Sequence, residues 1–256
     1  MARETWILLR GLAREAGHWG RFFPAMTTAM ADADVLALDL PGAGARLHDT
    51  WPESIGAAME MVRSEARSRI LPDSKVVLFG VSLGGMVVTE WAARHPGEVL
   101  GVAVGASSAG NVSPFWRRMR PRGLFAIVMG ALAKDAAQRQ ARVAPVLTNR
   151  RDLRDQIVRD WAEIERQRPV ARATVSAQLA SARRWRAPAS LGVPSLFLVG
   201  RGDRLVDPEC TRQLARRYAA PVVEHADAGH DLTTDATEWV VDELLKFRAR
   251  VREPAA

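Results

Sequence analysis

Lys75-Val76-Val77-Leu78-Phe79-Gly80-Val81-Ser82-Leu83-Gly84-Gly85 is the stretch that decides the fold. Its first five residues are mainly apolar and β-branched, which predicts a buried β-strand. The residues that follow, up to His95, have a helical pattern that Pro96 ends. Because a strand and a helix flank the glycine-rich segment, Ser82 is predicted to lie at the tip of a sharp turn. Side chains at the flanking glycines would collide there with the neighbouring strand and helix.

Six short apolar segments predict β-strands, and helix-like stretches separate most of them. The helix predicted over 52–71 has apolar residues at helical spacing, and Thr50 with Glu53 forms a candidate capping box. The last helix is predicted to begin near Asp235. This alternation is typical of an α/β fold, with a mostly parallel sheet flanked by helices on both faces. The predicted strands cover residues 5–9, 35–38, 76–79, 99–104, 195–199 and 222–226.

The alternation stops after the fourth predicted strand. Residues 111–187 show only helical patterns, one of them near 151–168, where Pro169 closes it. A 77-residue connection without a strand is too long for a loop between two strands. We therefore predict an inserted helical subdomain at 111–187 and an α/β core formed by 1–110 and 188–256.

Positive charge is concentrated in the predicted subdomain. Residues 111–187 contain 17 Lys and Arg against 6 Asp and Glu, a balance of +11, whereas the 256-residue chain as a whole carries +7. Such a segment suits an acidic partner, although helices solvated by arginine explain the same count. Because no aromatic-interleaved motif accompanies the charge, we expect no nucleic-acid partner.

The remaining composition indicates the compartment. The single cysteine, Cys210, allows no internal disulfide, which fits a reducing cytoplasm. The apolar run from Trp6 to Leu9 is too short for a signal peptide, and Arg10 interrupts it. No apolar run approaches the ~20 residues of a membrane span. We predict a cytoplasmic protein without a membrane span.

Ser82 needs two partners to act as a nucleophile, because a serine hydroxyl is weakly nucleophilic at neutral pH. A histidine must take its proton, and a carboxylate must orient that histidine. His230 follows the last predicted strand, where sites of open α/β sheets are built, whereas His225 lies within that strand. Asp203 follows the fifth strand, whereas Asp207 precedes Pro208 and is a natural helix N-cap. His230 and Asp203 are the favoured base and acid.

A tetrahedral intermediate also needs backbone donors for its oxyanion. The N–H of Leu83, directly after Ser82, is one candidate, and that of Leu12, after the first strand, is the other. Further residues are candidates for lining an acyl pocket, although ordinary packing explains each of them as well. These are His18, Trp19, Phe115, Trp116, Met119 and Phe125.

Taken together, these motifs resemble the α/β-hydrolase fold family over nearly the whole chain. The resemblance rests on Gly80-Val81-Ser82-Leu83-Gly84-Gly85, Asp39-Leu40-Pro41-Gly42-Ala43-Gly44, Gly200-Arg201-Gly202-Asp203 and Gly229-His230. It implies a serine hydrolase with an inserted helical cap and with neither a metal nor an organic cofactor. It assigns Ser82 as nucleophile, Asp203 as acid and His230 as base. The serine separates the chain from dehalogenases and epoxide hydrolases, which have an aspartate there.

The chain departs from the family pattern in two ways. Where the family commonly has His-Gly before the oxyanion donor, this chain has Arg10-Gly11, which puts the anchoring of that loop in question. The chain also begins almost directly at the strand that contains Trp6, so we expect the antiparallel strands that often precede it to be missing. We therefore expect a smaller sheet of about six strands.

The expected activity is hydrolysis of a small or medium acyl ester through an acyl-enzyme. Thioesters, lactones and activated C–C bonds are further substrates of such a site. A narrower hypothesis has an acidic carrier protein deliver its acyl ester to the basic cap, as the similar build of the biotin-pathway esterase suggests. The alternative from another class is a non-catalytic protein that uses the cleft to bind a ligand or partner.

Overall fold

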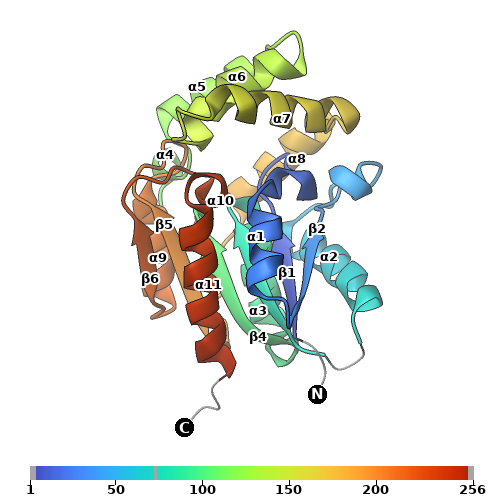
Figure 1. Ribbon diagram of the computed structural model, residues 1–256, viewed down its shortest axis with the longest axis vertical. Coiled ribbons are helices and arrows are strands. Elements are labelled where there is room, and N and C mark those ends of the chain that lie inside the picture. Colours follow the sequence, from blue (N-terminus) through green and yellow to red (C-terminus); the bar gives the residue numbers. More distant parts are fainter. Residues whose placement is uncertain (1–3, 72–73, 253–256) are drawn as a thin grey trace.

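The computed structural model describes residues 4–71 and 74–252. Six parallel strands form one sheet in the order β2-β1-β3-β4-β5-β6 (Figure 1). The predicted α/β fold and the expectation of a small, six-stranded sheet are thereby confirmed. The strands are β1 (Thr5–Leu9), β2 (Asp34–Leu38), β3 (Val76–Val81), β4 (Val99–Gly105), β5 (Ser195–Gly200) and β6 (Val222–His225).

Alternating side chains along each strand build two cores, because successive residues point to opposite faces of a sheet. In β1, Ile7 and Leu9 belong to the core under α2 (Ile55–Arg69), α3 (Leu83–Arg94) and α9 (Pro208–Arg217). Trp6 and Leu8 belong to the core under α1 (Phe22–Ala29) and α11 (Thr237–Arg252). All four are fully buried, and each such side chain contributes about 1.5–3 kcal/mol to folding.

Helices cover both faces of the sheet, as the alternating pattern predicts (Figure 1). The helices packed on the sheet are α1 (Phe22–Ala29), α2 (Ile55–Arg69), α3 (Leu83–Arg94), α9 (Pro208–Arg217) and α11 (Thr237–Arg252). The remaining short elements are η1 (Ala16–Trp19), η2 (Gly44–Arg46), η3 (Pro96–Glu98) and α10 (Leu232–Asp235).

Five helices lie between β4 and β5, and Figure 1 shows α5, α6 and α7 above one end of the sheet. They are α4 (Phe115–Arg118), α5 (Pro121–Ala131), α6 (Ala136–Leu147), α7 (Arg154–Gln167) and α8 (Arg172–Arg184). We call residues 111–187 the helical segment. Its α7 matches the helix predicted near 151–168.

Two predicted helix caps are wrong. Ser54, not a Thr50–Glu53 box, caps α2, because its side chain accepts a hydrogen bond from Ala57 N. The last helix, α11, begins at Thr237, near Asp235 as predicted, but Asp235 is not its N-cap, since it ends α10. Its carboxylate instead accepts hydrogen bonds from Thr148 and from backbone N–H groups, including that of Gly229 at 2.6 Å. Near α2 both Thr50 and Ser54 are residues that cap helices, whereas tertiary contacts engage Asp235.

The strand order reverses beside β1. The chain passes from β1 to β2 on one side and then returns to β3 on the other side. Leu9 in β1 pairs with Gly80 in β3, so these two strands end together. In open α/β sheets such a switch point leaves a crevice at the carboxyl ends of the strands, where ligands bind. The loops that follow β1 and β3 contain Gly11 and Ser82.

Candidate active site

Ser82 lies at the tip of the predicted turn between β3 and α3. Its backbone is left-handed, with φ 57° and ψ −117°, a conformation that few non-glycine residues adopt. The turn is fixed by hydrogen bonds from Ser82 N to Gly105 O (2.9 Å) and from Ser107 Oγ to Ser82 O (2.8 Å). Such local strain persists only where the surrounding structure enforces it, and it is concentrated at functional sites.

The two flanking glycines are required by close backbone packing. A Cβ at Gly80 would overlap the carbonyl of Gly84, and a Cβ at Gly84 would overlap the carbonyl of Leu9. Strand β1, strand β3 and helix α3 therefore pack too closely here for any side chain. This is the collision predicted from the sequence.

Asp203 and His230 meet in a buried contact. His230 Nδ1 lies 2.8 Å from Asp203 Oδ2, and the two residues are 5% and 3% exposed. The other carboxylate oxygen, Oδ1, accepts hydrogen bonds from the N–H groups of Leu205 (2.8 Å) and Val206 (2.9 Å). With the carboxylate held on Nδ1–H, the Nε2 atom of the ring is left to accept a proton.

The competing residues have structural contacts. Asp207 caps α9, since its Oδ1 accepts a hydrogen bond from Glu209 N (3.0 Å), as predicted. His225 Nδ1 accepts a hydrogen bond from Ala228 N (3.0 Å), and its ring packs edge-on against Trp239. Asp203, by contrast, both shapes its own turn and contacts His230. In residues 4–71 and 74–252, no hydrogen bond joins the Ser82 hydroxyl to His230; such bonds often form only with substrate bound.

The loop after β1 passes directly over Ser82. A Cβ on Gly11 would lie 3.1 Å from Ser82 Cβ and 3.5 Å from its Oγ. The N–H of Leu12 follows in this loop, and that of Leu83 begins α3. Within the part of the chain that the structure describes, neither N–H donates a hydrogen bond. Both are free donors beside the serine.

Arg10 anchors this loop, a role that sequence reasoning missed. Its guanidinium is 4% exposed and donates to Asp231 Oδ2 (2.5 Å) and to Thr233 Oγ1 (2.9 Å). Burial opposes ionisation of Asp231, but the charge and hydrogen bond of Arg10 outweigh it and lower the pKa of Asp231 to about 2. No local sequence pattern pairs Arg10 with Asp231, because the two residues are 221 positions apart. The pair joins the loop over Ser82 to the loop of the candidate base.

The predicted pocket residues have different surroundings. Trp19 is 1% exposed and packs against Phe22 and Phe79 in the core. Met119 packs against Leu205 and Val206, in the turn after Asp203. Arg120, which was not predicted, donates to the Asp203 carbonyl (2.7 Å) and so ties the helical segment to that turn.

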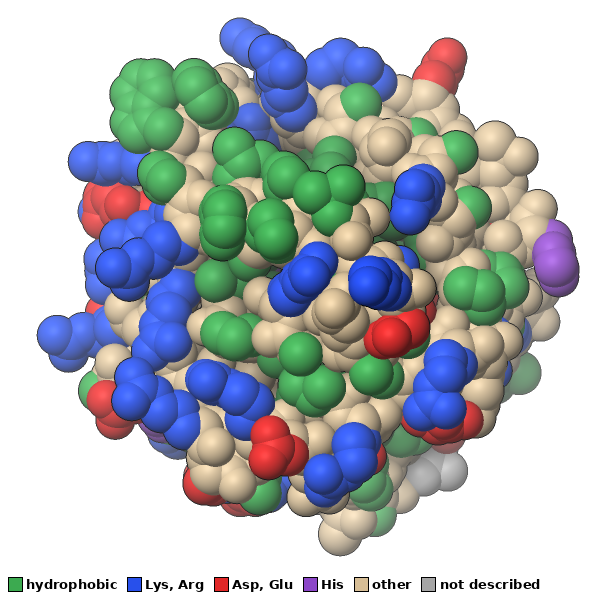
Figure 2. Space-filling view, turned by 90° about the horizontal axis from the view of Figure 1, so that it is seen from above, with side chains coloured by type: hydrophobic (Ala, Val, Ile, Leu, Met, Phe, Trp, Pro, Cys, Tyr) green, Lys and Arg blue, Asp and Glu red, His purple; other side chains and the backbone are tan. Residues whose placement is uncertain are grey.

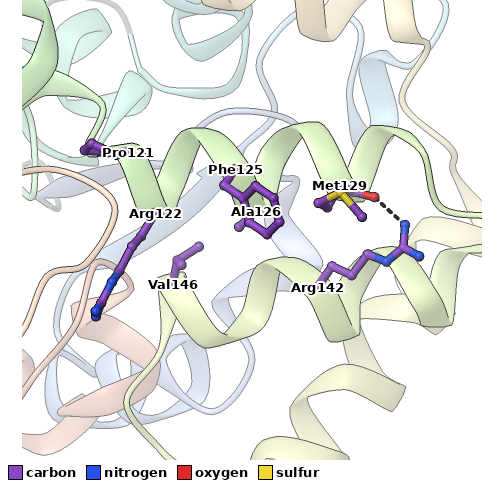
Figure 3. Close-up of a pocket in the computed structure, with 7 residues that line it drawn as sticks. All are labelled: Pro121, Arg122, Phe125, Ala126, Met129, Arg142 and Val146. Carbon is purple, nitrogen blue, oxygen red and sulfur yellow. Dashed lines mark hydrogen bonds between the residues drawn. The ribbon is translucent and has the colours of Figure 1, made fainter.

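Phe115 and Trp116 are 70% and 60% exposed and pack edge-to-face against each other. Figure 2 shows hydrophobic side chains gathered among Lys and Arg on the surface viewed from above. Phe125, 67% exposed, lies in a groove of about 570 Å³ between α5 and α6, lined also by Arg122 and Arg142 (Figure 3). A pocket role for Phe115, Trp116, Met119 and Trp19 stays a prediction.

The described residues show neither a metal-binding cluster nor a membrane-spanning helix. No group of three or more His, Cys, Asp or Glu side chains there is placed to hold a metal ion. No helix in residues 4–71 and 74–252 is long and apolar enough to cross a membrane. The predicted cytoplasmic location stays a prediction.

The parallel sheet, the strained serine turn and the buried Asp–His pair at the carboxyl ends of the strands define an α/β-hydrolase architecture. Residues 6–243 match the model of the alpha/beta hydrolase family, and the chain belongs to that family. The fold is shared with the esterase RhEst1 from Rhodococcus sp., with a TM-score of 0.76, 19% identity and coverage of 97% of this chain and 91% of that one.

Two curated proteins are similar in sequence. The pimeloyl-[acyl-carrier protein] methyl ester esterase of Neisseria meningitidis is 28% identical over 252 residues, covering 88% of this chain and 76% of that protein. The biotin biosynthesis bifunctional protein BioHC of Teredinibacter turnerae is 28% identical over 144 residues. That match covers 52% of this chain and only 24% of BioHC, so it bears on one part of the larger protein.

Proposed function

We propose that this protein is a serine hydrolase that cleaves carboxylic esters with Ser82, His230 and Asp203. The observation that carries the proposal is the buried 2.8 Å contact between His230 Nδ1 and Asp203 Oδ2. It lies at the same edge of the sheet as the strained turn of Ser82. A carboxylate-bound histidine at the same edge of the sheet as a half-buried serine at a strained turn fits the groups that activate a serine.

In this mechanism Ser82 Oγ attacks the ester carbonyl carbon while His230 Nε2 takes the hydroxyl proton. Asp203 keeps the proton on Nδ1 and stabilises the imidazolium. The N–H groups of Leu83 and Leu12 donate to the oxyanion, which they stabilise more strongly than the ground-state carbonyl. His230 then protonates the leaving alcohol, and an acyl-Ser82 ester forms. Water, deprotonated by His230, hydrolyses that ester and restores the free serine.

A fluorophosphonate probe tests this proposal, because it phosphonylates only activated serines. Intact-protein mass spectrometry should show one added probe on the native protein and none on Ser82→Ala. Ser68→Ala is the matched control, since Ser68 is an exposed serine on α2 whose hydroxyl bonds only to Glu65 O. A native protein that neither takes up the probe nor hydrolyses any simple ester would instead indicate the non-catalytic alternative.

The helical segment is proposed to act as a cap over this site, with 1–110 and 188–256 as the core. Its anchoring supports this: Arg120 bonds to the Asp203 carbonyl, and Trp161 of α7 packs beside His18, with 6.2 Å between the ring centroids. A cap placed there would select substrates by what fits between it and the Ser82 loops.

A narrower substrate, an acyl methyl ester carried by an acidic carrier protein, is favoured by one comparison. The Neisseria meningitidis relative is named for that chemistry. The balance of +11 in residues 111–187 supplies a surface of matching charge. A double charge reversal of the exposed Arg117 and Arg122 should lower kcat/KM for the carrier-bound ester and not for the free methyl ester. Arg250→Glu, on α11 away from the helical segment, is the control; equal losses on both substrates would exclude carrier docking there.

A further inference from the structure

Arg14 is a buried cation that forms no ion pair within the described residues. It lies between β1 and η1 and is 8% exposed. Within residues 4–71 and 74–252 its guanidinium makes no ion pair and donates no hydrogen bond, and its Nη1 is fully enclosed. Its Cζ lies 4.1 Å from the centroid of the Trp161 ring, on α7. A cation–π contact offsets little of the free-energy cost of burying a charged guanidinium. We therefore expect an anion to bind beside Arg14.

The carboxylates near Arg14 are already engaged. Asp231 pairs with Arg10, Glu165 with Arg139 and Glu15 with Arg168. Burial, together with the nearby charge of Arg10, lowers the pKa of Arg14 to about 10, so Arg14 still carries its charge at neutral pH. The protein therefore holds a charged guanidinium ready for an anion that the described chain does not supply.

Other unpaired groups in the same region are also donors. His18 Nδ1 accepts a hydrogen bond from Glu15 N (3.2 Å), so the neutral ring carries its proton on Nε2. Among the described residues, this Nε2 has no hydrogen-bond partner. Burial and the charge of Arg14 hold the pKa of His18 well below 6.5, which keeps that ring neutral. Gln178 is fully buried, and its Oε1 accepts a hydrogen bond from Ala13 N (3.0 Å). Its Nε2 has no partner in the part of the chain that the structure describes. Three donor groups that lack an acceptor among these residues indicate a site for an acceptor.

These donors lie next to the candidate active site. Arg14 N donates to Gly11 O (3.2 Å), and Gly11 is the residue that abuts Ser82. Gln178 holds the same loop from α8 through Ala13. Arg14 therefore belongs to the turn that lies next to an acyl group bound at Ser82.

We propose that Arg14, with His18 and Gln178, binds a carboxylate that the substrate carries in addition to its ester. The preferred substrate is then a half-ester of a dicarboxylic acid or another ester with a free carboxylate, a class distinct from the carrier-bound methyl ester considered above. A guanidinium donates two parallel hydrogen bonds to a carboxylate. The neutral His18 and Gln178 side chains would donate further hydrogen bonds to the carboxylate oxygens. This substrate class rests on the proposed ester hydrolysis, whereas the binding site itself does not.

The kinetic test compares monomethyl adipate with dimethyl adipate, which differ in one carboxylate. The native enzyme should have the higher kcat/KM for the monomethyl ester. Arg14→Gln should lower the ratio of the two kcat/KM values by about 10- to 100-fold, the range for a charge-assisted hydrogen-bonded contact. Arg166→Gln, which removes an exposed arginine from α7, is the matched control and should leave the ratio unchanged. A native preference for the dimethyl ester, or a ratio that Arg14→Gln does not move, would overturn the proposal.

A binding test works without turnover. Adipate should raise the melting temperature of the native protein and of Ser82→Ala, and Arg14→Gln should abolish the rise. If Arg14→Gln does not fold, Arg14→Lys replaces it. Lysine keeps the positive charge but lacks the two parallel N–H donors of the guanidinium, so it should weaken adipate binding several-fold. Two results would overturn the assignment to a substrate carboxylate. One is that phosphate or chloride raises the melting temperature and adipate does not, and the other is that adipate has no effect on it. If adipate binds through Arg14 but no ester is hydrolysed, the carboxylate site stands and the proposed hydrolysis fails.

Discussion

The carboxyl edge of the sheet and the outer surface of α4 and α5 use the same kinds of side chain in opposite ways. At the sheet edge, charged groups are buried and paired, as in Asp203 with His230 and Arg10 with Asp231. On the helical segment, arginines lie at the surface and large apolar side chains such as Phe115 and Phe125 are exposed. Single substitutions at the sheet edge should therefore lower stability or activity strongly, whereas substitutions on the outer surface should have small effects.

The largest expected effect is on the candidate base. His230→Ala should lower kcat for a simple ester by about 10⁴- to 10⁶-fold, the range found when a triad base is removed. The reason is that the proposed mechanism has His230 alone take the proton of Ser82. Steady-state hydrolysis and far-ultraviolet circular dichroism measure activity and folding together. A folded variant that keeps a tenth or more of the activity would remove His230 from the mechanism.

The two aspartates test whether burial and pairing, rather than closeness in sequence, decide function. Asp203→Asn should lower kcat by about 10⁴-fold, because an amide cannot hold the proton on Nδ1 of His230. Asp207→Asn is the matched control, since asparagine also caps helices and α9 should keep its start. It should leave kcat within about twofold. The reverse order of effects would mean that Asp207 is the acid.

Much of this edge could be predicted from the sequence, because local patterns encode it. Strand periodicity placed Ser82, Asp203 and His230 after the ends of strands, and proline placed Asp207 at a helix start. Arg10 could not be placed this way. Its partner Asp231 lies 221 positions away, and only the folded sheet brings the two together. The sequence lacks the histidine that the family commonly has before the oxyanion donor, and this put the anchoring of the loop in question. In the structure, the buried ion pair of Arg10 with Asp231 anchors that loop.

The sequence predicted that the helical segment consists of helices, but it could not predict how those helices pack on the core. Helical periodicity and Pro169 located α7, because those signals are local. The pattern could not show that Trp161 faces Arg14 and His18, while Phe115 and Trp116 face outward. How helices pack on a core depends on contacts between distant residues, and a hydrophobic residue at helical spacing does not specify its partner.

Breaking the buried ion pair should be the next largest effect. Asp231→Asn leaves the Arg10 guanidinium buried without an anion, which typically costs about 3–5 kcal/mol of unfolding free energy. Asp152→Asn is the control, because Asp152 pairs with Arg150 at the surface, and it should leave the urea midpoint unchanged. Urea unfolding followed by fluorescence measures both. Equal stabilities for Asp231→Asn and the native protein would show that the pair does not anchor the loop.

Acid should weaken the same pair by a smaller amount. The pKa of Asp231 is about 2 in the folded protein, below the ordinary value of 3.8, so the unfolded chain binds the proton first. Its contribution is therefore complete above pH ~4 and is lost as the pH falls from there to ~2, a change of about 2 kcal/mol. Urea unfolding at a series of pH values should show the native protein and Asp231→Asn drawing closer by that amount. Parallel curves would mean that Asp231 does not titrate in this way.

The smallest effect is expected on the exposed apolar surface. Phe125 is 67% exposed on α5, so Phe125→Ala should change the unfolding free energy by no more than about 0.5 kcal/mol. Phe197→Ala is the matched control, because Phe197 is fully buried in the sheet core and its loss should cost about 3–5 kcal/mol. If Phe125→Ala costs as much as Phe197→Ala, this surface is covered in solution, either by a second copy or by a movement of α5. The contrast between the two regions would then fail, because the apolar side chains of the helical segment would belong to a core of their own.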